Sequence, residues 1–171
     1  CFSELVDESI RKKYRRKVNL HDKEREDLNL DVKNANKYLD SGFDLFVPTD
    51  VTIPAGKIAL IDMGIKCAVF TAVEPPIDPT PSPYYLYARS SVGKRGIILV
   101  NSVGIIDSGY RGHLMACVDC HGEENYHISQ YDRLLQIVAF SGRPIFVKLV
   151  ENHKDLGVTI RGDGGFGSTG K

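Results

Sequence analysis

Short runs of Ile, Val and Leu, separated by turn residues, dominate the chain from residue 28 onward. The clearest runs are GKIALIDMGIKCAVF (56–70), RGIILVNSVGII (95–106) and RLLQIVAF (133–140). Runs of this length and composition, with no helix-length periodic stretch between them, predict strands. We therefore expect an all-β domain over 28–160 rather than alternating strands and helices.

The start of the chain follows a helical pattern instead. Four apolar residues recur at helical spacing: Leu5, Val6, Ile10 and Tyr14. Ser3 is a residue type that caps helices, so we expect a helix from residue 3 to about 19 within a charged extension, 1–27. The basic run RKKYRRK (11–17) is typical of a solvated helix face, with a nuclear-localisation or phosphate-binding patch as the alternative.

Two segments are rich in residues that interrupt regular structure. EPPIDPTPSPYY (74–85) carries five prolines and predicts an exposed loop. RGDGGFGSTGK (161–171) is dominated by glycine and predicts a mobile C-terminal arm.

Composition narrows the class of protein. The 171 residues suit one domain, and 22 basic residues balance 22 acidic ones, so charge predicts neither a nucleic-acid nor a membrane partner. No apolar run has the length of a membrane-spanning helix. Four cysteines are too few for a secreted disulfide scaffold, which favours a reduced cytoplasmic or nuclear setting.

The motif CVDCH (117–121) matches the C-x-x-C-H pattern of haem attachment. The preceding LMACV (114–118) favours a strand, whose alternation would put Cys117 and Asp119 on one face and Val118 and Cys120 on the other. No second Cys/His pair lies at zinc-site spacing. We expect neither haem nor zinc here.

The last seven residues, 165–171, fit G-x-x-x-x-G-K, the start of an ATPase phosphate loop. Such a loop joins a strand to a helix and carries Ser or Thr after the Lys, and neither feature accompanies this stretch. The glycines can still offer backbone N–H groups to phosphates, with Arg161, Ser168 and Thr169 beside them. Phe166 is a plausible surface for stacking on a base.

Four upstream segments carry clustered polar residues: DSGFDLFVP (40–48), YARSSVG (87–93), NSVGIIDSGYRG (101–112) and YDRLLQI (131–137). Together with the Gly-rich end, and in this order, they resemble the five signature motifs of the trimeric dUTPase family, the dUTP diphosphatases. The resemblance covers roughly residues 30–170. It is most specific in VGIIDSGYRG and RGDGGFGSTG. Tyr131 departs from it, because the fourth motif usually has Gly there.

The resemblance implies a dUTPase-type β-barrel or jelly-roll subunit in a homotrimer, with an extra N-terminal helix. Each active site would combine the hairpin of one subunit, the phosphate contacts of a second and the C-terminal arm of a third. The implied reaction is hydrolysis of dUTP to dUMP and pyrophosphate with Mg²⁺, which keeps uracil out of DNA and supplies dUMP for dTMP synthesis.

The same resemblance implies the roles of individual residues. Asp107 would be the catalytic base for the water that attacks the α-phosphorus. Three residues would bind the uracil, Asn101, Gly104 and Met115, and Ile106 would be a further substrate-binding residue. Tyr110 would pack under the sugar and exclude a 2′-hydroxyl.

The phosphate contacts would come from two regions. Those from the body of the chain would be Arg89, Ser90, Ser91 and Gln136. Those from the arm would be Arg161 and Ser168, with Phe166 covering the uracil and Gly167 as a further substrate-binding residue. Asp44 would reach Mg²⁺ through a bound water, since the triphosphate itself would hold the ion.

Two other functions compete with this interpretation. A dCTP deaminase of the same fold needs a carboxylate on the strand after the hairpin, and Cys117 occupies that place. A non-catalytic nucleotide-binding regulator would be signalled by loss of Asp107, Arg89 or Phe166, and all three are present.

Overall fold

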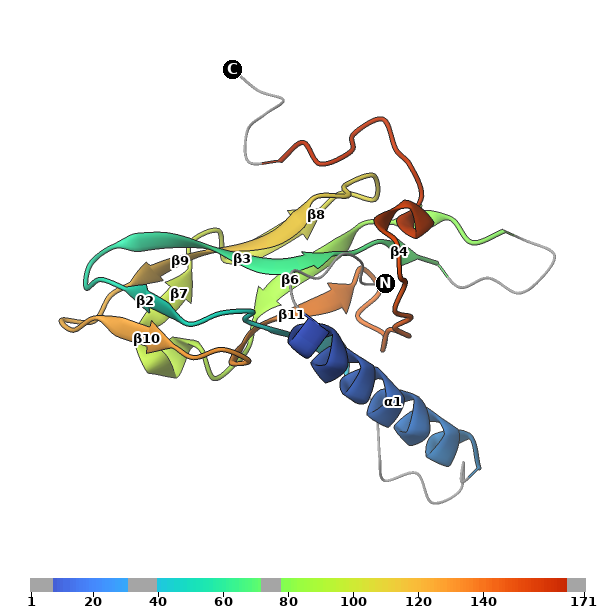
Figure 1. Cartoon of the computed structure of the whole chain (residues 1–171), viewed down its shortest axis with the longest axis horizontal. Helices are drawn as coiled ribbons and strands as arrows, with labels where there is room; N and C mark the ends of the chain where they lie inside the picture. Colours follow the sequence, from blue (N-terminus) through green and yellow to red (C-terminus); the bar gives the residue numbers. More distant parts are fainter. Residues whose placement is uncertain (1–7, 31–39, 72–77, 166–171) are drawn as a thin grey trace.

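The computed structural model describes residues 8–30, 40–71 and 78–165. One long helix precedes a series of short strands (Figure 1). The elements are α1 (Glu8–Leu30), β1 (Gly42–Phe46), β2 (Val51–Ile53), β3 (Ile58–Lys66), β4 (Val69–Phe70), β5 (Pro81–Ser82), β6 (Tyr84–Ala88), η1 (Gly93–Arg95), β7 (Ile97–Leu99), β8 (Val103–Ile106), β9 (His113–Cys120), β10 (Tyr126–Ile128), β11 (Arg133–Ala139) and η2 (His153–Leu156).

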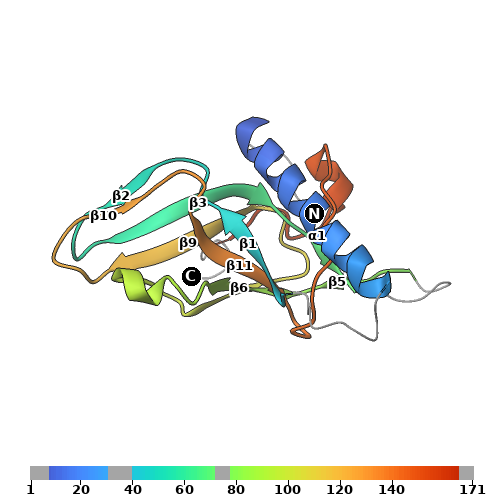
Figure 2. The same cartoon turned by 90° about the horizontal axis from the view of Figure 1, so that it is seen from below.

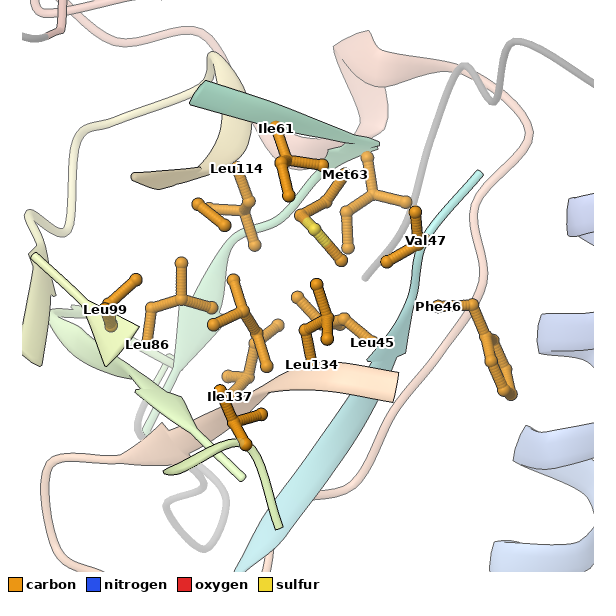
Figure 3. Close-up of a cluster of buried hydrophobic side chains, with 14 of the residues drawn as sticks. Leu45, Phe46, Val47, Ile61, Met63, Leu86, Leu99, Leu114, Leu134 and Ile137 are labelled. Carbon is orange, nitrogen blue, oxygen red and sulfur yellow. The ribbon is translucent and has the colours of Figure 1, made fainter. Parts of the chain in front are cut away.

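The strands form antiparallel sheets around one apolar core. A four-stranded sheet has the order β1–β11–β6–β8, and a three-stranded sheet has the order β3–β9–β7. Two short pairs, β10–β2 and β4–β5, extend them. Side chains such as Leu45, Met63, Leu86 and Leu114 meet between the two larger sheets (Figure 3). The predicted all-β class and the added N-terminal helix are both confirmed.

Strand β9 shows how the sequence pattern specifies the sheet. Its residues alternate strictly between half-buried and buried positions from His113 to Cys120. Val118 and Cys120 point into the core, whereas Cys117 and Asp119 lie on the other face, as the alternation predicted. Slipping the register by one residue would expose the apolar set. Burial of that set therefore fixes the register of the strand.

The Pro-rich segment is more ordered than predicted. Pro81 and Ser82 form β5 and pair with β4, and Tyr84 begins β6 with only 1% of its surface exposed. The loop prediction was therefore wrong for residues 81–85, while residues 74–77 lie outside the described residues. Pro is compatible with a short edge strand because the missing N–H is not needed there.

Helix α1 is longer than predicted. It continues to Leu30, so the expected end at about residue 19 was wrong. The second half, HDKEREDLNL (21–30), contains neither Gly nor Pro, and its charged residues are compatible with a helix. The predicted cap Ser3 lies outside the described residues.

One stripe of α1 belongs to the core. Ile10, Tyr14 and Val18, spaced four residues apart, are 1%, 0% and 7% exposed. The Tyr14 ring packs on Phe46 with centroids 5.1 Å apart. Burial raises the pKa of the Tyr14 hydroxyl. Figures 2 and 3 show the helix beside β1, so α1 covers one end of the four-stranded sheet.

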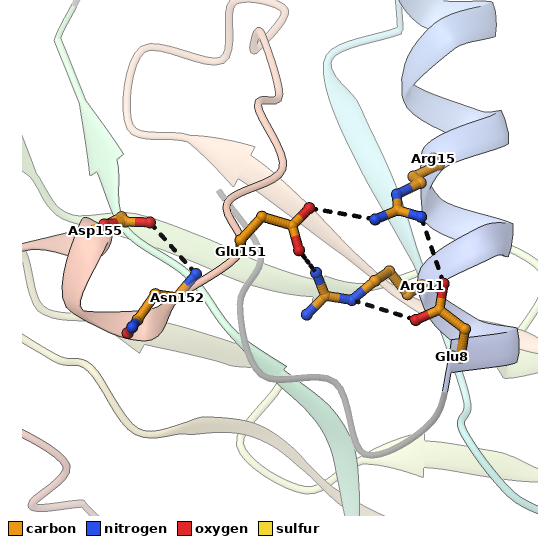
Figure 4. Close-up of polar contacts among 6 residues, drawn as sticks. All are labelled: Glu8, Arg11, Arg15, Glu151, Asn152 and Asp155. Carbon is orange, nitrogen blue, oxygen red and sulfur yellow. Dashed lines mark hydrogen bonds and ion pairs between the residues drawn. The ribbon is translucent and has the colours of Figure 1, made fainter.

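The basic run is not a uniformly solvated face. Arg11 and Arg15 both contact Glu151 in the C-terminal segment, and Glu8 pairs with the same two guanidinium groups (Figure 4). Lys17 turns toward the sheet, with only 23% of its side chain exposed. The interpretation of this run as a solvated face was therefore wrong for part of it. Exposed pairs like those of Glu151 contribute little each, but they hold α1 against the domain.

Tyr131 adopts φ +70°, in the left-handed region that favours glycine. This conformation explains why the fourth motif usually has Gly at this place. Here α1 supports the tyrosine, because its hydroxyl donates to Ser9 Oγ at 2.7 Å and Lys13 Nζ lies 4.7 Å from its ring centroid. The helix and the departure from the motif therefore belong together.

The contact between Tyr14 and Phe46 gives a first prediction. The register between β1 and β11 shifts between Asp44 and Phe46, and the Phe46 N–H donates to the Tyr14 hydroxyl at 2.8 Å. Tyr14→Phe should lower the free energy of unfolding by about 1–3 kcal/mol, because it leaves a buried amide without its acceptor. Urea unfolding followed by circular dichroism measures this.

Tyr126→Phe is the matched control, since it removes a half-buried hydroxyl on the separate β10–β2 pair. We expect it to change the unfolding free energy by less than about 0.5 kcal/mol. Equal losses in the two variants would contradict a structural role for the Tyr14 hydroxyl.

Candidate active site

A cavity of about 220 Å³ opens between strands β7, β8 and β9 and the start of the C-terminal arm. Its walls mix aliphatic side chains with a few polar groups. The lining residues are Leu86, Leu99, Asn101, Gly104, Ile105, Ile106, Asp107, Tyr110, His113, Leu114, Met115, Arg161 and Gly165. A small concave site with few convergent polar groups is the usual form of a small-molecule pocket.

The cavity wall formed by β8 and the turn before it depends on close approach of the backbone to Leu86. Ser102 takes φ +57° at the turn, and its N–H donates to the Leu99 carbonyl at 3.0 Å. At Gly104, a Cβ would lie 3.1 Å from Leu86 Cβ and 3.8 Å from Asn101 Nδ2. A larger residue there would press against Leu86, while its contact with Asn101 would be an ordinary one. Glycine therefore keeps the backbone of β8 open to a ligand.

Asp107 follows β8 at the rim of the cavity and is about half exposed. Its carboxylate lies 2.8 Å from Nη1 of Arg161, the first residue of the arm. Its own carbonyl accepts from the Tyr110 N–H at 3.0 Å, which closes the turn. The turn aims a charged carboxylate at the cavity mouth, where water has access to it.

Tyr110 forms one side of the cavity. Its hydroxyl donates to the His113 carbonyl at 2.9 Å. Burial, and then the nearby Asp163 carboxylate, raise the pKa of this hydroxyl. A Cβ at Gly112 would lie 2.4 Å from the Tyr110 oxygen, and one at Gly165 would lie 3.2 Å from the ring. The ring is thus held between two glycines.

The start of the arm packs against the turn between β8 and β9 of its own chain. The Thr159 hydroxyl donates to the Gly109 carbonyl and accepts from the Gly162 N–H at 3.1 Å. The Arg111 N–H donates to the Gly162 carbonyl at 2.7 Å. The Arg111 guanidinium donates to the carbonyls of Leu156 and Gly157. These contacts bring Arg161 to Asp107.

A second polar cluster surrounds Asp44 on β1. Its Oδ1 lies 2.8 Å from Nε of Arg89, and its Oδ2 lies 3.1 Å from Nη1 of Arg133 and 3.6 Å from Nζ of Lys17. Only 14% of the Asp44 side chain is exposed. Burial lowers the pKa of Lys17, and the two arginines add to this while Asp44 opposes it. Positive charge exceeds negative charge here.

Two further predicted residues lie near this cluster. Gln136 faces Gly42, where an added Cβ would fall 1.9 Å from Gln136 Oε1, and its amide donates to the Ala88 carbonyl at 3.4 Å. The Ser91 hydroxyl is buried and has no hydrogen-bond partner among the described residues. An unsatisfied hydroxyl of this kind is costly unless a ligand or water reaches it.

The predicted site residues therefore fall into three groups. Those that line the cavity are Asn101, Gly104, Ile106, Asp107, Tyr110, Met115 and Arg161. Those outside it, on or next to β1, β6 and β11, are Asp44, Arg89, Ser90, Ser91 and Gln136. Phe166, Gly167 and Ser168 lie outside the described residues.

Strand pairing gives an estimate of the distance between the cavity residues and the residues around Asp44. Ile106 pairs with Tyr84 at one end of β6, whereas Arg89 follows the other end. At about 3.3 Å per residue, Asp107 and Arg89 lie roughly 15–20 Å apart in one chain. A single subunit does not bring the predicted base and the predicted phosphate contacts together.

Sequence reasoning missed several participants. His113 lines the cavity and its Nδ1 lies 2.8 Å from an Asp62 oxygen, and Arg111 anchors the arm. Arg133 and Lys17 complete the Asp44 cluster. The basic run was the only signal for Lys17, and nothing in it distinguishes one lysine from the next.

Other chemistries find little support in these residues. The described part of the chain holds no group of three or more His, Cys, Asp or Glu side chains arranged for a metal ion. Cys117 is half-buried on β9 and does not line the cavity. Among the described helices, none is long and apolar enough to cross a membrane.

Fold and cavity define an all-β protein with a small-molecule pocket and one carboxylate at its rim. The sequence model of the dUTPase family matches residues 29–170. The deoxyuridine 5'-triphosphate nucleotidohydrolase of Clostridium tetani is 38% identical over 133 residues, which cover 77% of this chain and 83% of the relative. The chain therefore belongs to the dUTPase family.

A second relative agrees. The enzyme of the same name from Clostridium acetobutylicum is 36% identical over 132 residues, covering 77% of this chain and 83% of the relative. The crystal structure of dUTPase from Streptococcus mutans matches with a TM-score of 0.49 and 26% identity, over 68% of this chain and 86% of that chain. Most of α1 precedes the matched region.

The anchoring of the arm gives the second prediction. Thr159→Val keeps the shape of the side chain but removes the hydroxyl that bridges Gly109 and Gly162. We expect hydrogen exchange of the Gly162 amide to accelerate about tenfold, because the lost bonds are worth on the order of 1–1.5 kcal/mol.

Thr52→Val is the control, since the Thr52 hydroxyl contacts His127 on the separate β10–β2 pair. Its variant should leave exchange at Gly162 unchanged. Unaltered exchange in Thr159→Val would show that the hydroxyl does not hold the arm.

Proposed function

We propose that this protein is a dUTP diphosphatase, which hydrolyses dUTP to dUMP and pyrophosphate. The observation that carries the proposal is the cavity lined by β7, β8 and β9, with the half-exposed Asp107 carboxylate at its rim. Membership of the dUTPase family supports dUTP as the substrate of this cavity. The consequence for the cell is removal of dUTP before it enters DNA and supply of dUMP for dTMP synthesis.

Asp107 acts as the general base. A carboxylate at the cavity mouth is accessible to water and can orient and deprotonate the molecule that attacks the α-phosphorus. In the structure Arg161 lies 2.8 Å from this carboxylate of its own chain. When the arm reaches the nucleotide of a neighbouring subunit, Arg161 exchanges the carboxylate for phosphate there, which frees Asp107 for the water.

The nucleoside occupies the cavity. Backbone groups of Gly104, Ile106 and Met115, with the Asn101 amide, read the donor and acceptor edge of uracil, which differs from that of cytosine. The close packing of Gly104 on Leu86 supports a narrow slot that excludes the methyl group of thymine. The Tyr110 ring, held by its bond to the His113 carbonyl, packs under the deoxyribose and excludes a 2′-hydroxyl.

The triphosphate meets the Asp44 cluster of another subunit. Arg89, Ser90, Ser91 and Gln136 hold the phosphate chain. The buried Ser91 hydroxyl, which has no hydrogen-bond partner in the described part of the chain, supports this assignment. The calculated separation of roughly 15–20 Å between Asp107 and Arg89 in one chain supports a site shared between subunits of a homotrimer. The arm, with Phe166, Gly167 and Ser168, closes over the nucleotide and excludes bulk water.

Magnesium would bind together with the substrate. Both Asp44 oxygens contact cationic side chains, which argues against direct ligation of Mg²⁺ by this carboxylate. The residues instead fit an ion carried by the triphosphate, with Asp44 reaching it through a bound water. When bound, Mg²⁺ supplies neutralising charge to the phosphate oxygens.

A panel of dUTP, dCTP, dTTP and UTP, followed by pyrophosphate release and by ammonia release, tests the activity. We expect rapid pyrophosphate release from dUTP and none from the other three. Asp107→Asn should lower kcat by at least about a hundredfold while the variant still binds nucleotide, as expected for loss of a general base. Near-normal turnover of Asp107→Asn would contradict the base assignment, and ammonia release from dCTP would support a deaminase instead.

Subunit mixing tests the shared site. A chain ending at residue 160 keeps Asp107 but lacks the arm, whereas Asp107→Asn keeps the arm but lacks the base. Each protein alone should be nearly inactive. Mixed and reassembled trimers should recover a measurable fraction of the activity, because one chain supplies the base and the other supplies the arm. Absence of any recovery in mixed trimers would show that each arm serves its own chain.

A further inference from the structure

Helix α1 reaches into the cluster that the proposed function assigns to phosphate. Most of the helix lies before residues 29–170, so the family match does not account for it. Lys17 leaves the helix toward β1, and its Nζ lies 3.6 Å from Asp44 Oδ2. The same ammonium lies 4.6 Å from the Phe43 ring centroid and 5.7 Å from that of Phe46. Two aromatic rings and a carboxylate thus fix its place.

The cluster carries more positive charge than its carboxylate balances. Three cations, Lys17, Arg89 and Arg133, surround Asp44. The arginines already engage both Asp44 oxygens at 2.8 and 3.1 Å, which leaves Lys17 the longest contact. An ammonium with three donors and one long ion pair retains capacity for another acceptor. Partly buried positive charge of this kind is stabilised by an incoming anion.

A purely structural ion pair is the simplest alternative. It would bring one cation to one carboxylate, whereas here a third cation approaches two that are already paired. Lys17 is 23% exposed and Arg89 is 27% exposed, so both remain accessible to a ligand. The exposed lysine of the preceding turn, Lys13, instead lies over Tyr131 and Phe46.

We propose that Lys17 of α1 is a binding residue for the polyphosphate chain of the nucleotide, beside Arg89. The inference rests on the proposed function, because that function assigns Arg89 to the phosphates. Lys17 adds one charge-assisted contact from an element outside the matched region. Its effect falls on binding rather than on the chemical step, since the base Asp107 lines the cavity and lies outside the Asp44 cluster.

The experiment compares Lys17→Met with Lys12→Met and Lys17→Arg in the full chain. Met keeps the aliphatic stem over Phe43 without the charge, and Lys12 is an exposed lysine of the same helix. Inorganic tripolyphosphate is the probe, with its affinity measured by calorimetry. We expect about tenfold weaker binding for Lys17→Met, which corresponds to one charge-assisted contact, and unchanged binding for Lys12→Met and Lys17→Arg.

Turnover of dUTP supplies the second measurement. Lys17→Met should raise KM about tenfold and leave kcat within about twofold, provided that circular dichroism shows a folded protein. Wild-type tripolyphosphate affinity in Lys17→Met would overturn the inference, and so would tighter binding, which would mean that Lys17 competes with phosphate. If Lys17→Met unfolds, a weakened affinity in Lys17→Gln supports the inference and an unchanged one overturns it.

The two levels of proposal fail separately. Absence of dUTP hydrolysis by the wild-type chain overturns the proposed function, whatever Lys17 does. Hydrolysis by the wild type together with unchanged tripolyphosphate affinity in Lys17→Met overturns only the role of Lys17.

Discussion

The carboxylate of Asp44 joins four segments that are distant in sequence. It contacts Arg89 at the end of β6, Arg133 at the start of β11 and Lys17 on α1, while it belongs to β1 itself. Strands β1, β11 and β6 are neighbours in one sheet, so the ion pairs cross the sheet at one end. Without this carboxylate the three cations would face one another in a partly buried space, which is unfavourable. The phosphate end of the proposed site and the docking of α1 therefore depend on the same group.

The helix is part of the domain rather than an appendage to it. Tyr14 is fully buried and accepts the Phe46 amide hydrogen at the point where the strand register shifts. Ser9 and Lys13 contact Tyr131, whose left-handed conformation would otherwise favour glycine. The residue that departs from its motif, Tyr131, is thus contacted by the helix that lies mostly outside the family match. Lys17 of the same helix reaches the Asp44 cluster.

The two ends of the proposed site obey different constraints. The cavity end requires backbone to approach closely, which Gly104 and Gly112 allow. The cluster end requires balanced charge, which one carboxylate among three cations does not provide without an anion. Strand β6 separates the two ends within a chain. This separation is the physical reason that a shared site between subunits suits the fold.

Much of this protein was predictable because the controlling interactions are local. The alternation in HLMACVDC predicted which side of β9 enters the core, since side chains of a strand alternate by geometry. The residues around Asp107 and Tyr110 are close in sequence, and they line one cavity. Errors arose where local signals were weak or contested. No residue marks the end of α1 near 19, and strand pairing with β4 overrides the proline at 81.

By itself, the sequence determined the all-β class, the order of the motifs and the family, because these depend on residue types and their spacing. Only the tertiary structure decided the partners of its charged groups. Asp107 meets Arg161 and Asp44 meets Lys17 across long stretches of chain. Among many surface charges, packing selects which pairs come within reach, and sequence spacing carries no record of that selection.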